Sequence, residues 1–524
     1  MLWSGWGDPA RARELPEQVR KLLHDLLGVR APATPAAALG EVRLPPVALP
    51  ASLQAVLAGV VGEAHVLTGH EDRVRHTRGK STPDLLRMRA GDGSYAPDAV
   101  VLPGSHDEVA ELLRLCSRER VAVVPFGGGT SVVGGLAPAG GAHGRARFAG
   151  VVALDLRRLD RLRSVDTESM IAEFEPGVRA PDAERLLAAH GLTLGHFPQS
   201  FEYATLGGFA AARSSGQASA GYGRFDDMVA GLTLATPAGD LELGRAPKSA
   251  AGPDLRQLVL GSEGAFGVIT ALRLRVRRAP AERRYEGWRF PTFAAGSAAA
   301  RALAQEGPLP TVLRLSDETE TMIGLADPGA IGSGGPGGCL MITGYEGARV
   351  EPRRTEASAV LARLGGEPLG EAPGQAWEHG RFSAPYLRDS LLAAGATVET
   401  LETAGFWANL PRLYDAVRLA LLGALGSPLV LCHISHVYET GACLYFTVVV
   451  AQDGEPVAQW ERAKEAVNAA VVEAGGTITH HHGVGRDHLE AYGREIGPVG
   501  VGILRAVKAS VDPEGVLNPG VLIP

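Results

Sequence analysis

The sequence predicts an α+β protein built from several structural units. A chain of 524 residues is longer than one hydrophobic core usually serves. Short β-rich runs alternate with helical patterns from Ala96 onward, and the texture loosens after about residue 280. We expect a helical extension over 1–92, a first α+β domain over 93–280, a second domain over 281–475, and a C-terminal segment over 476–524 that returns to the first domain.

The extension is expected to contain an amphipathic helix between proline-rich joints. Apolar residues recur at helical spacing between Leu15 and Arg30. These residues are Val19, Leu22, Leu23, Leu26 and Leu27. We interpret the helix as packed against the body of the protein. A helix on a membrane surface is the alternative, because Arg20 and Lys21 flank the apolar stripe.

The first domain is expected to alternate strands with helices. Apolar and β-branched runs predict strands at 99–102, 121–125, 151–156, 171–175, 229–236 and 267–276. Helical periodicity predicts a helix over 106–120, whose buried face carries Val109, Leu112, Leu113 and Cys116.

The second domain has a weaker pattern. Strands are predicted at 339–344, 429–435 and 442–450, followed by a helix over 455–473. The glycine-rich stretch from Asp327 to Gly338 is interpreted as a linker or a surface loop.

Composition narrows the function classes. The formal net charge of −7 argues against nucleic-acid binding. Four cysteines without CxxC spacing are interpreted as reduced and buried, which is typical of the cytoplasm. No apolar run reaches the roughly 18 to 20 residues that span a bilayer, and the first residues lack a signal-peptide pattern. A cytoplasmic location is expected, with membrane association as an addition to it.

A glycine loop follows the strand predicted at 121–125. The segment PFGGGTS covers 125–131, and its three consecutive glycines bring no side chains to a core. Such backbone is typical of places where amide groups approach phosphate oxygens. The pattern matches neither GxGxxG nor GxxxxGK[ST], which disfavours NAD and ATP pockets of those types.

Three later segments have the same small, polar, turn-forming character. They lie at 195–208, 213–216 and 261–270. Four such segments in one α/β region suit a long cofactor with a pyrophosphate and a flat ring better than a small substrate.

Three consecutive histidines, His480, His481 and His482, lie in the segment ITHHHGVG. Imidazole titrates near neutrality, so the run indicates either proton transfer or metal binding. On an extended segment His480 and His482 share one face, so two of the three imidazoles line one site. We rank a metal second and predict none, because no acidic ligand accompanies this run in a recognised spacing.

The four loops, in this order and at these distances, resemble the FAD-binding segments of the vanillyl-alcohol oxidase/p-cresol methylhydroxylase (PCMH) family. The resemblance implies a PCMH-type FAD-binding domain of two subdomains and a cap domain over the flavin ring. It implies FAD contacts from Pro125, Phe126, Gly127, Gly128, Gly129, Thr130, Ser131, Gln199, Ser200, Tyr203, Thr205, Arg213, Ser214, Ser215, Glu263, Gly264, Gly267, Val268 and Ile269. The PFGGGTS loop has no histidine, so noncovalent FAD is expected.

Three further segments narrow the resemblance. HHHGVG at 480–485, HISHVYETGACLYF at 433–446 and LWSGWG at 2–7 resemble the alkyldihydroxyacetonephosphate synthase family of ether-lipid biosynthesis. Flavin dehydrogenases of 2-hydroxy acids carry GDGNxH-like and GEHGxG segments instead. The resemblance covers nearly the whole chain and is weakest between about 280 and 430. It implies a transferase that replaces the acyl group of acyl-dihydroxyacetone phosphate with a long-chain alcohol.

The resemblance also implies roles for single residues. Tyr445 is the acid/base, with His480, His481 and His482 as neighbours that tune it. Arg388 binds the substrate phosphate, supported by Arg314 and His196. Each residue has a structural alternative: an ion pair for the arginines, a core aromatic for Tyr445, and a backbone hydrogen bond for His196.

Two other functions stay open from the sequence. One is an FAD-dependent dehydrogenase or oxidase of a 2-hydroxy acid such as D-lactate or glycolate. The other is a flavin-binding scaffold without turnover. A homodimer and peripheral membrane contact are general expectations for the family, although no segment indicates either.

Overall fold

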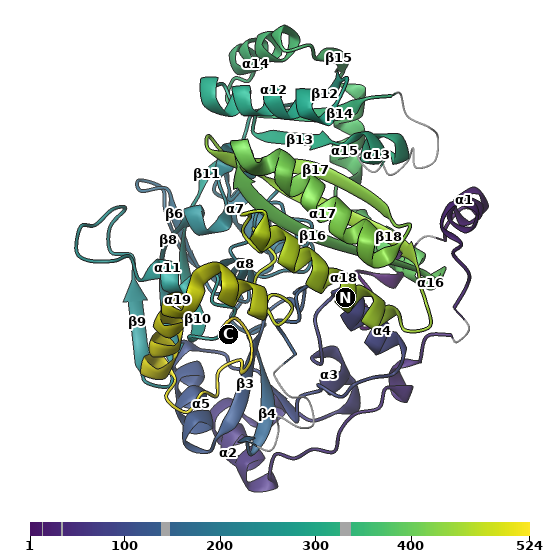
Figure 1. Cartoon of the computed structure of the whole chain (residues 1–524). Helices are drawn as coiled ribbons and strands as arrows, with labels where there is room; N and C mark the ends of the chain where they lie inside the picture. Colours follow the sequence, from purple (N-terminus) through teal and green to yellow (C-terminus); the bar gives the residue numbers. More distant parts are fainter. Residues whose placement is uncertain (13, 33–34, 138–146, 325–336) are drawn as a thin grey trace.

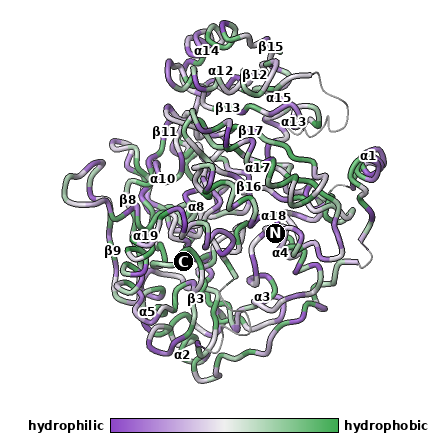
Figure 2. The backbone as a smooth tube through the Cα atoms, viewed as in Figure 1, coloured by the Kyte–Doolittle hydropathy of each residue, from purple (hydrophilic) through white to green (hydrophobic). Residues whose placement is uncertain are grey.

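The computed structural model describes residues 1–12, 14–32, 35–137, 147–324 and 337–524. Within these ranges four-, five- and seven-stranded sheets, with a separate two-stranded pair, form the framework (Figure 1). Hydrophobic runs in Figure 2 follow the sheets, while hydrophilic segments are frequent in outer loops. The glycine-rich stretch from Asp327 to Gly338 lies almost entirely outside the described residues.

The N-terminal extension wraps around both domains. Its helices are α1 (Glu17–Leu27), α2 (Ala51–Val61), α3 (His70–Arg75) and α4 (Thr82–Arg89). The predicted amphipathic helix is α1, and it lies beside α16 of the second domain (Figure 1). Val19, Leu23 and Leu27 pack on a cluster that includes Leu391 and Val449, so the packed interpretation is correct.

A parallel core lies under the glycine loop. The first sheet has the order β1 (Val66–Leu67), β2 (Ala99–Val101), β4 (Gly150–Asp155) and β3 (Val121–Phe126), with β2 and β3 parallel to β4. Helix α5 (His106–Arg118) covers it with the predicted apolar face. Ser105 caps α5 by accepting a hydrogen bond from the Glu108 amide. The helix ends two residues earlier than predicted, and Arg120 has a left-handed φ of 54°.

The second subdomain is antiparallel. Its sheet has the order β5 (Leu162–Asp166), β6 (Ile171–Phe174), β10 (Val268–Arg275), β8 (Val229–Thr236) and β9 (Gly239–Leu243). Helices α7 (Ala180–Ala188), α8 (Leu206–Ala212), α9 (Ser219–Tyr222), α10 (Phe225–Met228) and α11 (Arg256–Val259) accompany it. The short strands β7 (Leu192–Thr193) and β11 (Arg277–Arg278) pair separately.

The seven-stranded sheet of the second domain is antiparallel. Its order is β15 (Glu367–Gly370), β12 (Glu282–Phe290), β14 (Cys339–Gly347), β13 (Val312–Ser316), β17 (Leu429–Val437), β18 (Gly441–Ala451) and β16 (Ala396–Phe406). Its helices are α12 (Phe293–Glu306), α13 (Glu318–Ile323), α14 (Glu351–Arg363), α15 (Ala372–Gly380), α16 (Ala384–Ala393), α17 (Leu410–Leu425) and α18 (Pro456–Glu473).

The two faces of this sheet have different roles. Side chains alternate along a strand, so Val430, Cys432 and Ile434 join the core under α12, α17 and α18. Leu431 and His433 point to the opposite face, which lies toward the first domain. After α18 the chain returns through α19 (Leu489–Val511), and the last residues rejoin the first sheet where Leu517 bridges to Val123.

The four cysteines are buried and unpaired, as predicted. Among the helices of the described residues, none is both long and apolar enough to span a membrane.

Candidate active site

A large cavity lies between the first domain and the open face of the seven-stranded sheet. Its volume is about 590 Å³. The glycine loop forms one wall, and strands β13, β16, β17 and β18 form the opposite wall. One space therefore meets both the predicted cofactor loops and the predicted catalytic residues.

The glycine loop presents free amides to this cavity. Among the described residues, none accepts a hydrogen bond from the backbone N–H groups of 127–131. A Cβ on Gly128 would lie 2.1 Å from the carbonyl oxygen of Tyr203, so only glycine fits. A row of free amides at the end of a strand is an anion-binding arrangement. The loop therefore fits the pyrophosphate of a dinucleotide cofactor.

Most of the predicted cofactor residues line the same cavity. They are Pro125, Phe126, Gly127, Gly128, Gly129, Thr130, Ser131, Gln199, Ser200, Thr205, Ser214, Ser215, Glu263, Gly264, Gly267, Val268 and Ile269. Two predicted residues are not in this lining. Arg213 donates hydrogen bonds to the carbonyls of Leu260 and Gln257, which ties two loops together. The Tyr203 ring instead packs edge-on against Trp6.

Tyr445 lies on the cavity face of β18. Its cross-strand neighbours are Glu402 on β16 and His433 on β17. The phenol ring stacks on His433 at 4.8 Å between centroids and lies 6.0 Å from His481 and 5.7 Å from His482. Burial raises the pKa of Tyr445 to about 12. The tyrosine is therefore protonated at neutral pH.

The histidine run is a turn held by one buried carboxylate. Glu402 accepts the backbone N–H groups of His480, His481 and His482, and also the hydroxyl of Thr479. This turn places His481 and His482 on the cavity wall, with His480 behind them. The prediction that two imidazoles line the site is correct, but the pair His480 and His482 is wrong, because the segment turns around Glu402 and is not extended.

The imidazoles are neutral at neutral pH, so they can tune the tyrosine by hydrogen bonding and not by positive charge. Burial lowers the pKa of His481, and burial lowers that of His482 to about 3 even though Glu402 raises it. Burial alone would raise the pKa of Glu402, but its interactions with the histidine run and with the Thr479 hydroxyl hold it well below its usual value. The histidines can therefore serve as hydrogen-bond donors and acceptors.

Arg314 is held by an acidic partner at the edge of the cavity. Its guanidinium pairs with Glu320 at 2.8 Å and contacts His433 Nε2 at 3.0 Å. Burial would raise the pKa of Glu320, but Arg314 and His433 lower it to about 2. Arg314 therefore forms the ion pair that was the alternative to substrate binding, and it also lines the cavity.

A second cationic group lies around Arg388. Its guanidinium donates to the Lys80 carbonyl at 2.6 Å and pairs with Asp389 at 3.2 Å. The Asp389 carboxylate also accepts the backbone N–H of Trp6. Burial, with a contribution from Arg388, lowers the pKa of Lys80 to about 7. Lys80 and Arg388 both line the cavity and together offer counter-charge to an anion.

His196 lies outside the cavity lining. It is buried against Phe209 and Phe225, and its Nε2 lies 3.0 Å from the Ser214 hydroxyl. His196 was predicted to support substrate binding, with a backbone hydrogen bond as the alternative, and its partner in the structure is instead a hydroxyl. Because Ser214 lines the cavity, His196 can act on the site only through that residue.

Comparisons with known proteins agree with this geometry. The protein-family model described as FAD binding domain matches residues 97–243. The family model described as FAD linked oxidases, C-terminal domain, matches residues 279–522. Alkyldihydroxyacetonephosphate synthase of Dictyostelium discoideum is 35% identical over 478 residues, which are 86% of this chain and 77% of that protein. The chain belongs to the alkyldihydroxyacetonephosphate synthase family.

Solved structures extend the agreement to the fold. A structure of an alkyldihydroxyacetonephosphate synthase has a TM-score of 0.82 at 29% identity and covers 99% of this chain and 98% of its own. Substrate-bound p-cresol methylhydroxylase, at 15% identity, has a TM-score of 0.69 over 91% of this chain and 98% of its own. The predicted α+β, PCMH-type architecture is confirmed, and FAD is the cofactor of this family member.

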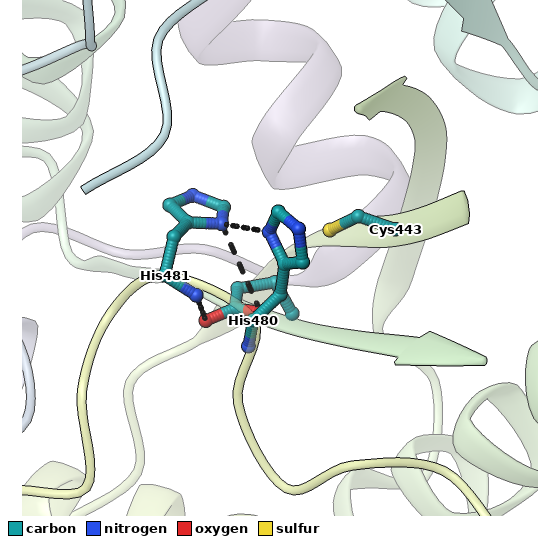
Figure 3. Close-up of side chains that lie close together, drawn as sticks. Cys443, His480 and His481 are labelled. Carbon is teal, nitrogen blue, oxygen red and sulfur yellow. Dashed lines mark hydrogen bonds and ion pairs between the residues drawn. The ribbon is translucent and has the colours of Figure 1, made fainter. Parts of the chain in front are cut away.

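Several residues of the candidate site were not predicted from the sequence. Glu402 contacts the histidine run, Glu320 contacts His433 and Lys80 contacts Arg388, and each pair is distant in sequence. These three residues are charged and buried, but the sequence shows only the charge and not the burial. Glu402 also supplies the acidic group that the histidine run lacked as a metal site in the sequence. Donor atoms of Glu402, Cys443, His480 and His481 lie within 4.8 Å of one another (Figure 3).

Glu263 joins the cofactor loop to the histidine segment and predicts a pH effect. It accepts the amides of Val484 and Gly485 at 2.9 Å, and burial raises its pKa from 4.5 to about 7. The folded state thus binds more protons than the unfolded state between these values, so this group lowers stability as pH rises from 4.5 to 7. Glu263→Gln keeps an accepting oxygen and should remove up to about 3 kcal/mol of this loss.

Melting temperatures of wild type and Glu263→Gln from pH 4.5 to 7.5 measure the effect. The variant should gain stability relative to wild type as pH rises. Parallel curves across this range would show that Glu263 does not change its protonation there.

Proposed function

We propose that this protein exchanges the acyl group of an acyl-dihydroxyacetone phosphate for a long-chain alcohol, forming an ether and releasing a fatty acid. The observation that carries the proposal is a single cavity that joins FAD loops, a tyrosine, two cationic groups and a long apolar wall. Family membership supports the same chemistry, since the relatives are named for this synthesis.

The apolar wall suits alkyl chains. It combines α1 with residues of α16 and the open sheet face: Val19, Leu22, Leu23, Leu26, Leu27, Leu387, Leu391, Leu429, Leu431 and Val449. Each buried methylene contributes about 0.8 kcal/mol, so a long chain gains substantial binding energy here. A small 2-hydroxy acid would leave this wall uncovered, which disfavours the dehydrogenase alternative.

The polar end suits the phosphate and the reacting carbon. Lys80 and Arg388 offer the positive charge for the phosphate, and Arg314 offers a further guanidinium beside Tyr445. FAD, bound without a covalent bond, supplies an electrophilic centre when present. Tyr445 accepts the proton from C1 of the substrate on its phenolic oxygen. Because its pKa is raised to about 12, it accepts a proton only after giving its own to a neighbour.

Access for lipids is proposed at α1. Leu26 is 66% exposed and Leu22 is 38% exposed, although both also line the cavity. Figure 2 shows hydrophobic and hydrophilic residues alternating on this helix. A helix that is both cavity wall and surface supports contact with lipid at this point.

Ether synthesis can be measured directly. Purified protein with bound FAD is incubated with acyl-dihydroxyacetone phosphate and labelled hexadecanol, and the expected product is the labelled ether. An FAD-saturated protein that forms no ether would overturn the proposal. Anaerobic bleaching of the flavin by lactate, glycolate or 2-hydroxyglutarate would identify the dehydrogenase instead.

A further inference from the structure

His480 is the one imidazole of the run that lies behind the cavity wall. It is 7% exposed and absent from the cavity lining. Both of its ring nitrogens nevertheless have polar partners. Its Nδ1 lies 2.9 Å from Nδ1 of His481 (Figure 3), and its Nε2 lies 2.6 Å from the hydroxyl of Tyr438. His480 thus connects a residue of the cavity wall to a residue outside it.

The two contacts of His480 determine which ring nitrogens of His480 and His481 carry protons. Two imidazole nitrogens at 2.9 Å can hydrogen-bond only if one carries a proton and the other does not. When Nδ1 of His480 carries the proton, Nε2 accepts the Tyr438 hydroxyl and His481 keeps a proton on Nε2. The reverse arrangement leaves His481 Nε2 as an acceptor. Moving one proton along the chain converts one arrangement into the other.

The chain ends near the surface. Tyr438 is half-buried at the start of the β17–β18 turn, and the next residues, Glu439 and Thr440, are exposed. Arg224 interacts with Tyr438 and pairs with Asp226 at 3.0 Å. The Arg224 side chain is 18% exposed and provides the next polar group between the Tyr438 hydroxyl and solvent.

We propose that His481, His480 and Tyr438 form a proton relay between the cavity and the surface. This inference rests on the proposed function, which releases one proton per turnover. The bond from C1 to the acyl oxygen breaks with its electrons on the carboxylate, and a bond from C1 to the alcohol oxygen forms. The alcohol hydroxyl proton is released, and no atom is oxidised or reduced. One proton per turnover must therefore leave the cavity.

The groups around His480 and His481 favour a proton relay over a bound metal ion. Glu402 fixes the backbone of His480 and His481, so both rings keep their positions. The other polar groups around the pair are His436, His482, Cys443, Arg224 and Tyr445. The two Nδ1 atoms already satisfy each other at hydrogen-bond distance, whereas a bound metal would replace that contact.

Tyr438→Phe tests the relay in the FAD-loaded protein. It removes only the hydroxyl, and we expect kcat for ether formation to fall by about tenfold or more, with KM and FAD content unchanged. Added imidazole should restore part of the rate by carrying the proton. Tyr492→Phe is the matched control, because no hydrogen bond within the described residues uses the Tyr492 hydroxyl, and it should behave as wild type. His480→Gln, which keeps the backbone amide on Glu402, should reproduce the defect.

A second readout does not depend on turnover. NMR of protein with ¹⁵N-labelled histidine should show a shared proton between two imidazoles, and Tyr438→Phe should shift only that pair. An active wild type with an unimpaired Tyr438→Phe would overturn the relay. A wild type without ether synthesis but with the shared proton would overturn the proposed function and leave the hydrogen-bonded chain intact. One tightly bound metal ion per chain, lost in Cys443→Ser, would overturn the relay in favour of a metal site.

Discussion

Tyr445→Phe is expected to lower kcat for ether formation by about 10² to 10⁴-fold while FAD content stays unchanged. The substitution removes the phenolic oxygen and keeps the ring that stacks on His433 at 4.8 Å. No other described hydroxyl occupies this position between His433 and His481 on the cavity face. The reacting C1 proton would therefore lose its acceptor, but the walls that bind the substrate would remain.

The measurement compares kcat, KM and deuterium uptake at C1 of acyl-dihydroxyacetone phosphate in D₂O. We expect uptake to fall together with kcat and KM to change little. Tyr414→Phe serves as the control, because Tyr414 hydrogen-bonds Asp317 away from the cavity lining. Full activity in Tyr445→Phe would make this residue a wall of the cavity and would return the acid/base role to an imidazole.

Gly128→Ala is expected to remove most of the bound FAD. The added Cβ would lie 2.1 Å from the Tyr203 carbonyl oxygen and 2.8 Å from the Ala204 Cα. Both are backbone atoms, so the two loops must move apart and the row of free amides is distorted. Overpacking of this kind costs about 1–3 kcal/mol, which corresponds to roughly 5- to 150-fold in FAD affinity.

FAD content of the purified variant and its dissociation constant, from flavin fluorescence, measure the loss. Gly40→Ala is a suitable control, because nothing lies within 4 Å of the added Cβ. Equal FAD affinity in wild type and Gly128→Ala would show that the loop does not cradle the cofactor.

The cofactor loops could be predicted from the sequence because their chemistry is local. Consecutive glycines at 127–129 indicate that another group approaches the backbone closely, and this can be inferred without knowing the rest of the fold. Strands such as β8 were also predicted correctly, at Val229–Thr236, because their apolar residues are contiguous. In contrast β12 and β16 were missed, since glutamates interrupt the apolar pattern in both and arginines interrupt it further in β12.

The sequence by itself therefore determined the fold class, the family, and the glycine-rich loops, tyrosine and histidine run that meet at the cavity. Only the tertiary structure decided how these groups work together. Glu402 turns the histidine run, Lys80 joins Arg388, and His480 meets Tyr438, each across 42 or more residues of chain. Burial then shifts the pKa values of Tyr445 and His482 away from their usual values. Contacts and desolvation of this kind depend on which distant segments pack together, and no local pattern records them.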